Sequence, residues 1–474
     1  MFDVVVIGGG IVGGLILREL TKYQLSVCLL EKAGDVAMGE SKANSGIVHA
    51  GFDAPVGSLK AKFNVAGNKM MEGVCAELGV KFRRNGSLVV AFTEEDFKVI
   101  NDLKARGEVN GVDGLEIIDQ AQLRQMEKNI SDEAIAALYA PTGGIVCPYE
   151  LTIAAIGNAM DNGAKLLTDF EVADIEKIES GYIVTSKDGQ KIASKIVINC
   201  AGLYSGKIAE MVGDDIKIGA RKGEYILLDR ESGDFVSHTL FFTPTKLGKG
   251  ILVTQTVDNN ILLGPTAEEG NDSTETSANG LAFVIEKARK MCKNPPLFNT
   301  ITSFAGVRAY SSKHDFIIEE SKRAKGVIHC AGIESPGLTA SPAIAKYVVE
   351  TLVGGIITLE KNEAFNGTRK PDYFFKHLSM EEKNEIIKRD PSYGKIVCRC
   401  EQVTEGEILR AIRENPPAKD IDGVKRRTRS GMGRCQGGFC QPYVAELIAK
   451  EGGMSLTNVT KNGKGSNLLT GVTK

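Results

Sequence analysis

Apolar and polar positions alternate in a clear order at the start of the chain. Residues 3–7 (DVVVI) form a short, β-branched and continuous apolar run, which is typical of a buried parallel strand. The glycine-rich turn GGGIVGG occupies 8–14, a helical pattern (LILRELTKY) follows at 15–23, and a second strand-like run (LSVCLLE) ends on Glu31. The pattern therefore predicts a strand, a glycine turn, a helix, a strand and an acidic residue, in that order.

This order of elements is typical of a dinucleotide site. Gly8 permits the tight turn, Gly10 lets the backbone approach a pyrophosphate, and Gly13 permits close packing of the helix on the strand. The N–H groups and dipole at the start of the helix stabilise phosphates. Glu31 is placed to accept hydrogen bonds from a ribose diol. The motif by itself allows FAD or NAD, and a tight turn without a ligand is the alternative.

Further apolar runs at 195–202 (KIVINCAG) and 327–331 (VIHCA) predict more buried strands, and SPAIAKYVVETL at 341–352 predicts a helix.

A chain of 474 residues is too long for one compact core, so two or three domains are expected. Apolar residues make up 42% and charged residues 25%, and the formal net charge of −2 gives no argument for binding nucleic acid or an anionic membrane. No apolar run reaches the roughly 20 residues that span a bilayer, and the N-terminus lacks a basic leader. We therefore expect a cytoplasmic protein that is not itself transmembrane.

Ten cysteines fall into two groups. Six are scattered, mostly among apolar neighbours, and are predicted to be core residues: Cys28, Cys75, Cys147, Cys200, Cys292 and Cys330. The other four form a C-x-C pair, Cys398 and Cys400, and a C-x4-C pair, Cys435 and Cys440. Four thiolates from two loops can hold a [2Fe-2S] cluster or one structural zinc ion. A site that no longer holds a metal is the third alternative.

Two features accompany the second group of cysteines. Thr404, Glu405 and Glu407 predict that a helix begins after the first pair. A basic run precedes the second pair and consists of Lys425, Arg426, Arg427, Arg429 and Arg434. It could stabilise an anionic cluster or offer a docking face to an acidic partner, or it could be an ordinary solvated surface loop.

Five longer segments carry a resemblance to a known family. They are SKANSGIVHAG at 41–51, VINCAGLYSGKIA at 197–209, ARKGEYILLD at 220–229, SFAGVRAYSSKHDFIIEES at 303–321 and HCAGIESPGLTASPAIAKYV at 329–348. Together they resemble the D-amino-acid-oxidase-like FAD oxidoreductases over residues 1 to about 355. Within that family they are most similar to FAD-dependent glycerol-3-phosphate dehydrogenases of the anaerobic type and to L-2-hydroxyglutarate oxidases. The C-terminal cysteines resemble those of bacterioferritin-associated-ferredoxin-like [2Fe-2S] domains.

The resemblance implies an α/β fold, α+β overall. We expect a discontinuous Rossmann-like FAD-binding domain (1–85, 145–215 and 325–355) with an inserted antiparallel-sheet substrate domain (86–144 and 216–324). A helical linker at 356–394 would run around the edge of the FAD domain. A small helical [2Fe-2S] domain (395–453) and a polar tail (454–474) follow, and the tail is either flexible or laid on the surface.

The resemblance also assigns site residues. Those expected to contact FAD are Gly8, Gly10, Ile11, Val12, Gly13, Glu31, Lys32, Ser41, Asn44, Ser45, Gly46, His49, Val172, Ala201, Gly202, Arg308, Gly332, Ile333, Gly337, Leu338 and Thr339. The backbone of Val172 would hold the adenine. The helix after Gly337-Leu338-Thr339 would point its N-terminus at the flavin, where it would stabilise negative charge. The cluster ligands would be Cys398, Cys400, Cys435 and Cys440.

The catalytic candidates lie near the flavin in relatives. His49 either contacts the flavin or accepts the substrate hydroxyl proton, and the ordinary alternative is packing beneath the ring. Arg308 would bind an anionic substrate group, although a structural ion pair is its alternative. Arg221, Lys222 and Tyr225 are weaker candidates on one strand. Glycerol-3-phosphate enzymes often have histidine where Tyr225 stands and L-2-hydroxyglutarate enzymes have tyrosine, so the substrate stays open.

These parts predict hydride transfer from a secondary alcohol to FAD, followed by single-electron transfer through the cluster. The first hypothesis is oxidation of sn-glycerol 3-phosphate to dihydroxyacetone phosphate, and the second is oxidation of an L-2-hydroxy acid such as 2-hydroxyglutarate. A third is an oxidase with a purely structural cluster domain, and a fourth makes the C-terminal module a protein-binding or redox-sensing unit. No second glycine motif for NAD is present, so we expect a separate reductase subunit, quinone-linked or otherwise, in a possible hetero-oligomer. Covalent attachment of the flavin stays open.

Overall fold

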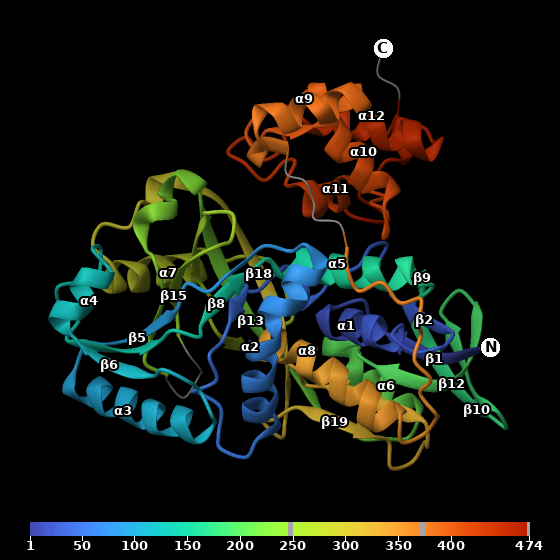
Figure 1. Cartoon of the computed structure of the whole chain (residues 1–474), viewed down its shortest axis with the longest axis horizontal. Helices are drawn as coiled ribbons and strands as arrows, with labels where there is room; N and C mark the ends of the chain where they lie inside the picture. The colour runs from blue at the N-terminus through green and yellow to red at the C-terminus, as the bar shows by residue number, and fades with distance from the viewer. Residues whose placement is uncertain (245–249, 370–374, 472–474) are drawn as a thin grey trace.

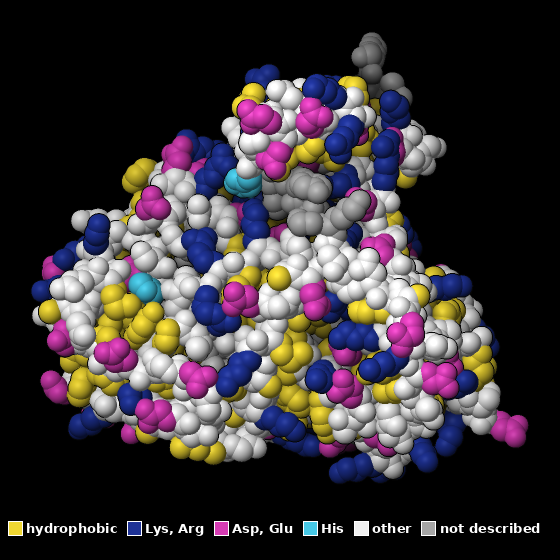
Figure 2. Space-filling view, viewed as in Figure 1, with side chains coloured by type: hydrophobic (Ala, Val, Ile, Leu, Met, Phe, Trp, Pro, Cys, Tyr) yellow, Lys and Arg dark blue, Asp and Glu magenta, His cyan; other side chains and the backbone are white. Residues whose placement is uncertain are grey.

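Two large sheets and a helical C-terminal lobe make up the computed structural model, which describes residues 1–244, 250–369 and 375–471 (Figure 1). Parts of the predicted substrate domain, linker and tail (245–249, 370–374 and 472–474) lie outside the described residues. Acidic and basic side chains are interspersed over the face seen in Figure 2. Within the described ranges, no helix combines the length and apolar character required to cross a membrane.

The first sheet contains the predicted dinucleotide elements. Its strands are β1 (Phe2–Ile7), β2 (Val27–Leu30), β9 (Lys165–Leu167), β10 (Val172–Ile178), β11 (Gly181–Ser186), β12 (Lys191–Asn199), β19 (Ile317–Glu320) and β20 (Val327–Ala331). β1 lies between β2 and β12 and is parallel to both, β9 extends the sheet beyond β2, and β20 pairs with β12 in parallel. This parallel core with β1 at its centre is the Rossmann-like arrangement that the sequence pattern predicts.

Successive side chains of β1 point alternately into two apolar cores, one on each face of the first sheet. Val4 and Val6 pack in one core with helices α1 (Ile11–Leu20), α2 (Leu59–Leu78), α5 (Pro148–Asp161) and α8 (Gly337–Tyr347). Val5 and Ile7 point to the opposite core, which includes α6 (Ser205–Met211). The helix predicted at 15–23 begins earlier, at Ile11, and ends at Leu20. The helix predicted at 341–352 begins at Gly337 and continues as a π-helix over Val348–Val353.

The second sheet is largely antiparallel. Its strands are β5 (Ser87–Ala91), β6 (Glu116–Asp119), β7 (Ala136–Ala140), β13 (Ile218–Leu228), β14 (Thr239–Phe242), β15 (Leu252–Gln255), β16 (Ile261–Gly264), β17 (Glu268–Glu269) and β18 (Thr300–Ser311). The helices α3 (Glu94–Val109), α4 (Gln120–Met126) and α7 (Ala278–Met291) accompany it. The β14–β5 pair is parallel, which departs from the predicted antiparallel sheet where its two chain segments meet. A small sheet of β3 (Ile47–Val48), β8 (Gly144–Val146) and β4 (Phe82–Arg83) completes the body.

The pairing of strand β19 changes where the substrate domain should end. β19 falls in the segment 216–324 that was assigned to the substrate domain, yet it pairs with β20 in the first sheet. We therefore propose that the boundary between the two domains lies before Ile317, and the remaining boundaries stay as proposed from the sequence.

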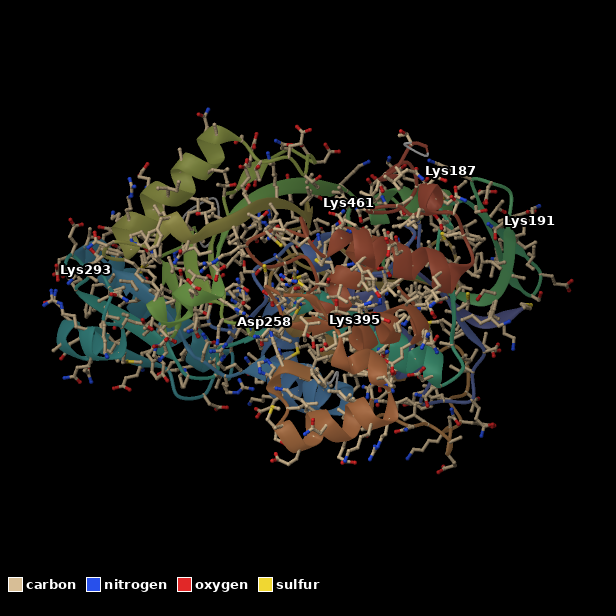
Figure 3. The ribbon with its side chains drawn as sticks, turned by 90° about the horizontal axis from the view of Figure 1, so that it is seen from above. Lys187, Lys191, Asp258, Lys293, Lys395 and Lys461 are labelled. Atoms are coloured by element: carbon tan, nitrogen blue, oxygen red, sulfur yellow. The ribbon has the colours of Figure 1, made fainter. Side chains whose placement is uncertain are left out.

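The C-terminal lobe has its own apolar core. It contains α9 (Met380–Arg389), β21 (Ile396–Cys398), β22 (Val403–Thr404), α10 (Glu405–Arg413), α11 (Ile421–Thr428) and α12 (Gln441–Gly452). The prediction of a helix after the first cysteine pair is confirmed, because Thr404 caps α10 in a capping box with Glu407. Seen from above in Figure 3, these helices lie over the middle of the body, with Asp258 near their edge and Lys187 and Lys191 at the far end of the first sheet.

The predicted linker divides into two parts. The first follows the edge of the first sheet's domain, where the N–H groups of Gln24 and Asn362 donate to the carbonyls of Glu360 and Lys22. The helical part, α9, lies instead with the C-terminal lobe, and the Phe375 N–H donates to Glu407. The expectation that a helical linker rounds the FAD domain is therefore wrong for α9, because α9 contacts the short helix Pro391–Gly394, which in turn contacts α10 of the lobe. The tail up to residue 471 includes an arm on the lobe, since the Ile421 N–H donates to Thr460 and Val459 is buried.

Candidate active site and cluster site

A cavity of about 1570 Å³ runs through the centre of the molecule. Its lining comes from the first sheet, the second sheet and the C-terminal lobe. Pockets for one small ligand typically hold about 300–1,000 Å³. This cavity therefore has room for a large cofactor together with a substrate.

The glycine turn at one end of the cavity cannot carry side chains at two positions. Gly8 has φ +110°, and a Cβ there would lie 2.4 Å from the carbonyl oxygen of Cys200. A Cβ on Gly13 would lie 2.1 Å from the carbonyl oxygen of Gly8, which explains the close contact of α1 with the turn. Gly10 precedes α1 without a side-chain cap, which leaves the helix N-terminus open to the cavity. These features fit a bound pyrophosphate.

Glu31 is held by the turn itself. The Gly9 N–H donates to one carboxylate oxygen at 2.7 Å, and the Ala33 N–H donates to the other at 2.8 Å. Burial raises the pKa of Glu31, while the two N–H groups act in the opposite direction. Each oxygen keeps a further lone pair, so the carboxylate can still accept from a ribose hydroxyl.

The loop at 41–49 links the turn to the other end of the cavity. The Ser41 hydroxyl accepts from the Ile11 N–H at 2.9 Å. The Asn44 side chain braces the loop, because it donates to the Glu40 carbonyl and accepts from the Gly46 N–H, both at 2.9 Å. Asn44 therefore holds the shape of the loop with its own amide.

His49 is positioned by residues far away in the sequence. Its backbone N–H donates to the Thr339 hydroxyl at 2.9 Å, and its Nε2 lies 3.3 Å from the Ser335 hydroxyl. The ring lies 5.8 Å from that of Phe241, centroid to centroid. His49 and Ser335 both line the cavity, so the imidazole is held where a substrate can reach it.

Strands β13 and β18 supply the other candidates. Their pairing sets Arg221 opposite Arg308 and Tyr225 opposite Phe304. The Tyr225 ring stacks on Phe304 at 4.8 Å, its hydroxyl lies 3.4 Å from that of Ser45, and burial raises its pKa.

The two arginines differ in their partners. Arg308 donates to the Thr266 carbonyl at 2.8 Å and makes no ion pair with another described residue. Arg221 is paired with Glu334 at 3.0 Å and with Glu269 at 2.8 Å. Arg308 is thus the guanidinium with capacity for an anion, and Arg221 already has carboxylate partners.

Lys222 does not belong to this pocket, contrary to the sequence-based expectation. It forms a buried ion pair with Glu224 at 3.0 Å and does not line the cavity. Successive residues of a strand point to opposite faces, so Arg221 and Tyr225 face the cavity while Lys222 faces away.

Glu40 is a group that the sequence analysis missed. It lines the cavity beside Arg308, and burial raises its pKa to about 8, against the opposing effect of Arg308. Its position directly before the 41–51 segment, which carries several predicted FAD contacts, could have identified it from the sequence. The cavity therefore holds two groups that can accept a proton from a substrate, the His49 imidazole and the Glu40 carboxylate.

Most of the predicted cofactor residues line this cavity. Three do not: Gly13, Gly332 and Thr339. Gly13 serves packing as described, and Gly332 has φ +63° with a Cβ position only 2.5 Å from the Ser311 side chain. Thr339 is fully buried and acts through His49.

The cysteines separate as predicted. The six scattered ones are buried and unpaired. In the C-terminal lobe, Cys400 Sγ lies 3.6 Å from Cys435 Sγ. The Cys440 thiol donates to Cys398, which lowers the pKa of Cys398 to about 6 and raises that of Cys440.

The arrangement of the four cysteines in two pairs helps to distinguish a [2Fe-2S] cluster from a zinc ion. Two thiolates on one tetrahedral metal, each about 2.3 Å from it, lie about 3.8 Å apart. A [2Fe-2S] cluster places two cysteines on each iron, whereas zinc would gather all four around one ion. Across the described ranges, no three His, Cys, Asp or Glu side chains converge on one metal position. Two separate pairs therefore fit the cluster better than zinc.

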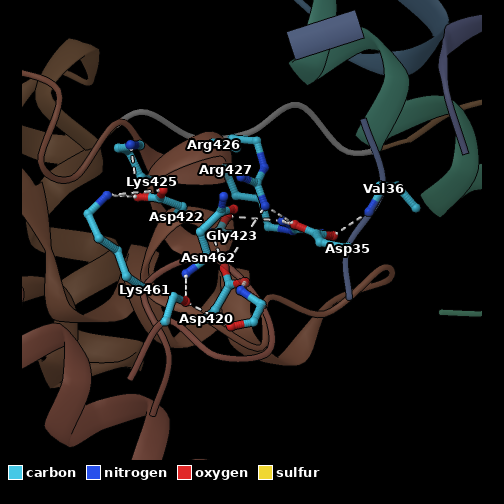
Figure 4. Close-up of polar contacts among 12 residues, drawn as sticks. Asp35, Val36, Asp420, Asp422, Gly423, Lys425, Arg426, Arg427, Lys461 and Asn462 are labelled. Carbon is cyan, nitrogen blue, oxygen red and sulfur yellow. Dashed lines mark hydrogen bonds and ion pairs between the residues drawn. The ribbon is translucent and has the colours of Figure 1, made fainter. Parts of the chain in front are cut away.

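The basic run is largely engaged in ion pairs, although the side chain of Arg434 remains 56% exposed. Arg426 and Arg427 both bind Asp35 of the first sheet's domain, as Figure 4 shows. Arg429 is buried between Asp258 and Glu401, at 2.8 and 3.0 Å. Arg434 pairs with Asp229 at 2.9 Å. The run therefore attaches the lobe to both sheets, because buried carboxylates on the body meet it.

Comparisons with known proteins agree with this arrangement. Residues 3–351 match the FAD dependent oxidoreductase family, and residues 396–450 match the BFD-like [2Fe-2S] binding domain. A glycerol 3-phosphate dehydrogenase of Caloramator mitchellensis is 50% identical over 100% of this chain and 99% of its own. The mitochondrial L-2-hydroxyglutarate dehydrogenase of Pongo abelii is 30% identical over 74% of this chain and 87% of its own.

A solved structure shares the fold. The FAD-bound, dithionite-reduced L-α-glycerophosphate oxidase of Mycoplasma pneumoniae superposes with a TM-score of 0.74 and 28% identity, covering 78% of this chain and 98% of its own. The glycine turn lies within the range that matches the FAD dependent oxidoreductase family, and the four C-terminal cysteines lie within the range that matches the BFD-like [2Fe-2S] binding domain. The chain belongs to the FAD-dependent oxidoreductase family, acts on a CH–OH group, and carries a C-terminal [2Fe-2S]-binding domain.

Proposed function

We propose that this protein oxidises sn-glycerol 3-phosphate to dihydroxyacetone phosphate and passes the electrons through its [2Fe-2S] domain to a separate acceptor. The observation that carries the proposal is the placement of Arg308, which forms no ion pair with a described carboxylate, in the same cavity as His49 and the glycine turn. The 50% identity to a glycerol 3-phosphate dehydrogenase supports it, because that similarity extends through the cysteine-bearing lobe.

The roles of the side chains follow from their positions. FAD held at the glycine turn would supply an acceptor for the hydride of the alcohol carbon, and a cluster held by the four C-terminal cysteines would supply one-electron chemistry. Arg308 binds the phosphate through charge-assisted hydrogen bonds and thereby orients the alcohol. His49 takes the hydroxyl proton on its imidazole, with Glu40 as the alternative base. Ser335 and Thr339 hold the imidazole and its backbone in place.

A second substrate class has one specific observation in its favour. Tyr225 stands where L-2-hydroxyglutarate enzymes have tyrosine, and its hydroxyl lies at the cavity beside Ser45. A carboxylate could occupy the place of the phosphate at Arg308. An L-2-hydroxy acid is therefore the alternative substrate on the same scaffold.

The acceptor would approach the outer cysteine pair. Cys398 and Cys440 are buried, whereas Cys400 and Cys435 are half-buried. Phe439, between the two cysteines of the second pair, is 86% exposed. We propose that a reductase subunit docks here and that the two proteins form a hetero-oligomer in the cytoplasm, with or without a membrane quinone as the final acceptor.

An anaerobic titration tests the proposal directly. Purified holoprotein is titrated with glycerol 3-phosphate and with L-2-hydroxyglutarate, while flavin and iron–sulfur absorbances are recorded together. We expect glycerol 3-phosphate to bleach both chromophores. Bleaching by L-2-hydroxyglutarate alone would transfer the assignment to the second substrate, and bleaching of flavin without the cluster would refute the relay.

Arg308→Lys separates the anion site from the rest of the pocket. The variant keeps the positive charge but loses the planar guanidinium group that can donate two parallel hydrogen bonds to a phosphate. We therefore expect kcat/KM for glycerol 3-phosphate to fall by about 10- to 100-fold. Arg221→Lys is the matched control on the neighbouring strand. It should affect kcat/KM less, because Arg221 is already paired with carboxylates.

A further inference from the structure

The C-terminal lobe forms part of the wall of the cofactor cavity. Asp422, Lys425 and Arg426 line the cavity together with Ser41 and Lys42 of the body. The lobe residues belong to the [2Fe-2S]-binding segment, whereas the FAD-binding motifs come from residues 3–351. The cavity is therefore completed by a second domain.

The guanidinium group of Arg426 has hydrogen-bond partners for only some of its N–H groups. Its side chain is 5% exposed, and Nη2 binds Asp35 at 2.5 Å. Its Nε is buried without a hydrogen-bond partner. A buried N–H of a guanidinium group without an acceptor is costly. Arg426 therefore lines the cavity with hydrogen-bonding capacity that the described residues leave unused.

Lys42 adds a second cation at the same place. It directly follows Ser41, whose hydroxyl accepts from the Ile11 N–H at the start of α1. The Lys42 side chain forms no ion pair with a described residue, and burial together with the charge of Arg426 lowers its pKa. Two incompletely satisfied cations thus meet beside the open N-terminus of α1.

The charge balance favours an anion. Five cations lie here with three carboxylates: Lys42, Lys425, Arg426, Arg427 and Lys461, with Asp35, Asp420 and Asp422. Arg426 Nη2 lies 4.0 Å from Asp420 in addition to its contact with Asp35. Figure 4 shows that Lys425 and Lys461 already hold Asp422, and that Asp420 accepts from backbone N–H groups. The remaining positive charge faces the helix end at which a pyrophosphate is expected.

We propose that Arg426 of the [2Fe-2S] domain, together with Lys42, binds the pyrophosphate of FAD. Arg426 and Lys42 line the same cavity as Glu31 and His49. Ser41, which precedes Lys42, accepts from the first N–H of α1, where the diphosphate is expected. FAD binding and docking of the lobe are then linked, and by reciprocity the cofactor stabilises the docked lobe. The inference rests on FAD binding and not on the proposed substrate.

The test compares two neighbouring arginines in the full-length apoprotein. FAD is titrated into Arg426→Gln and Arg427→Gln, and its Kd is measured from the change in flavin fluorescence. Arg427 also binds Asp35 through its guanidinium group. Its N–H groups are engaged with Asp35 and with backbone carbonyls, and Arg427 does not line the cavity. We expect the Kd to rise about 10- to 100-fold in Arg426→Gln, the range for a hydrogen bond to a charged group, and much less in Arg427→Gln.

Further variants guard against loss of folding or docking. Arg426→Lys retains the charge and should recover part of the affinity, and Lys42→Gln should weaken FAD binding independently of Asp35. Iron content and the iron–sulfur absorbance verify that the lobe is intact. Equal losses in Arg426→Gln and Arg427→Gln would overturn the proposal, because they would point to docking alone.

A competition experiment distinguishes FAD from a free phosphate ligand. Inorganic pyrophosphate should compete with FAD in the wild-type apoprotein and compete less well in Arg426→Gln. An unchanged FAD Kd in Arg426→Gln with a loss of pyrophosphate binding would overturn the assignment in favour of a separate anion. No substrate enters either measurement, so failure of glycerol 3-phosphate to bleach the flavin would leave this result unaffected.

Discussion

Arg427 binds Asp35 with both ends of its guanidinium group, at 2.8 Å to each carboxylate oxygen, across 392 residues of sequence. Asp35 also receives Arg426, and all three side chains are buried. This contact joins the [2Fe-2S] lobe to the domain that holds the glycine turn.

Asp35→Asn should loosen the whole attachment. The change removes the charge partner of the buried Arg427 and leaves Arg426 only the longer contact with Asp420 at 4.0 Å, and breaking a buried pair costs about 3–5 kcal/mol. We expect the free energy of unfolding to fall by that amount in urea denaturation. Asp169→Asn is the control, since Asp169 pairs with Lys464, whose side chain is 84% exposed, and should cost under about 1 kcal/mol. Equal effects would contradict the assigned importance of the buried pair.

The same carboxylate predicts a dependence on pH. Burial would raise the pKa of Asp35, but Arg427 and Arg426 outweigh it and lower the pKa from 3.8 to about 2. Its contribution is therefore present above about pH 4 and is lost as the pH falls towards 2, by about 2 kcal/mol. The difference in unfolding free energy between wild type and Asp35→Asn, measured between pH 2 and 5, should shrink by about 2 kcal/mol towards the acid end. A constant difference over that window would count against the low pKa.

Gly13→Ala should disturb the cofactor site. The added Cβ would lie 2.1 Å from the Gly8 carbonyl oxygen, so the turn must shift, at a cost of about 1–3 kcal/mol. We expect weaker FAD binding and a lower melting temperature. Gly73→Ala in α2, where nothing lies within 4 Å, should instead be neutral or stabilising. Retention of wild-type FAD affinity in Gly13→Ala would show that the turn tolerates the methyl group.

His49→Ala tests the base. Loss of a general base lowers the rate of flavin reduction by about 10²- to 10⁴-fold, which stopped-flow absorbance under anaerobic conditions measures. KM should change little, because Arg308 still binds the anion. Glu40→Gln is the comparison. If Glu40→Gln causes the larger loss and the wild-type rate rises with pH through about 8, the pKa of Glu40, then Glu40 is the base.

Cys435→Ser tests the route of the electrons. Removal of one of the half-buried thiolates should abolish iron binding, while substrate still reduces the flavin. Electron transfer to cytochrome c as a one-electron acceptor should slow markedly. Cys292→Ser removes a buried core thiol instead and should retain the iron. Unchanged transfer in Cys435→Ser, with stoichiometric peroxide, would make the lobe structural.

The sequence alone determined the elements whose signals are local. The order of strand, glycine turn, helix and acid, and the capping box at Thr404, each arise within a few residues, since backbone conformation and helix starts depend on neighbours in the chain. The cysteine spacing likewise indicated four ligands. These patterns predicted a dinucleotide site and a site with four cysteine ligands, and the family resemblance of the longer segments then specified FAD and a [2Fe-2S] cluster.

Only the tertiary structure decided which charges meet. It paired Arg221 with Glu334, turned Lys222 away from the cavity, placed Glu40 beside Arg308, and set the basic run of the lobe against Asp35 and Asp258. The strengths of such contacts depend on distance and burial, and both come from the packing of segments hundreds of residues apart. A run of cations has the same sequence whether water or a buried carboxylate faces it.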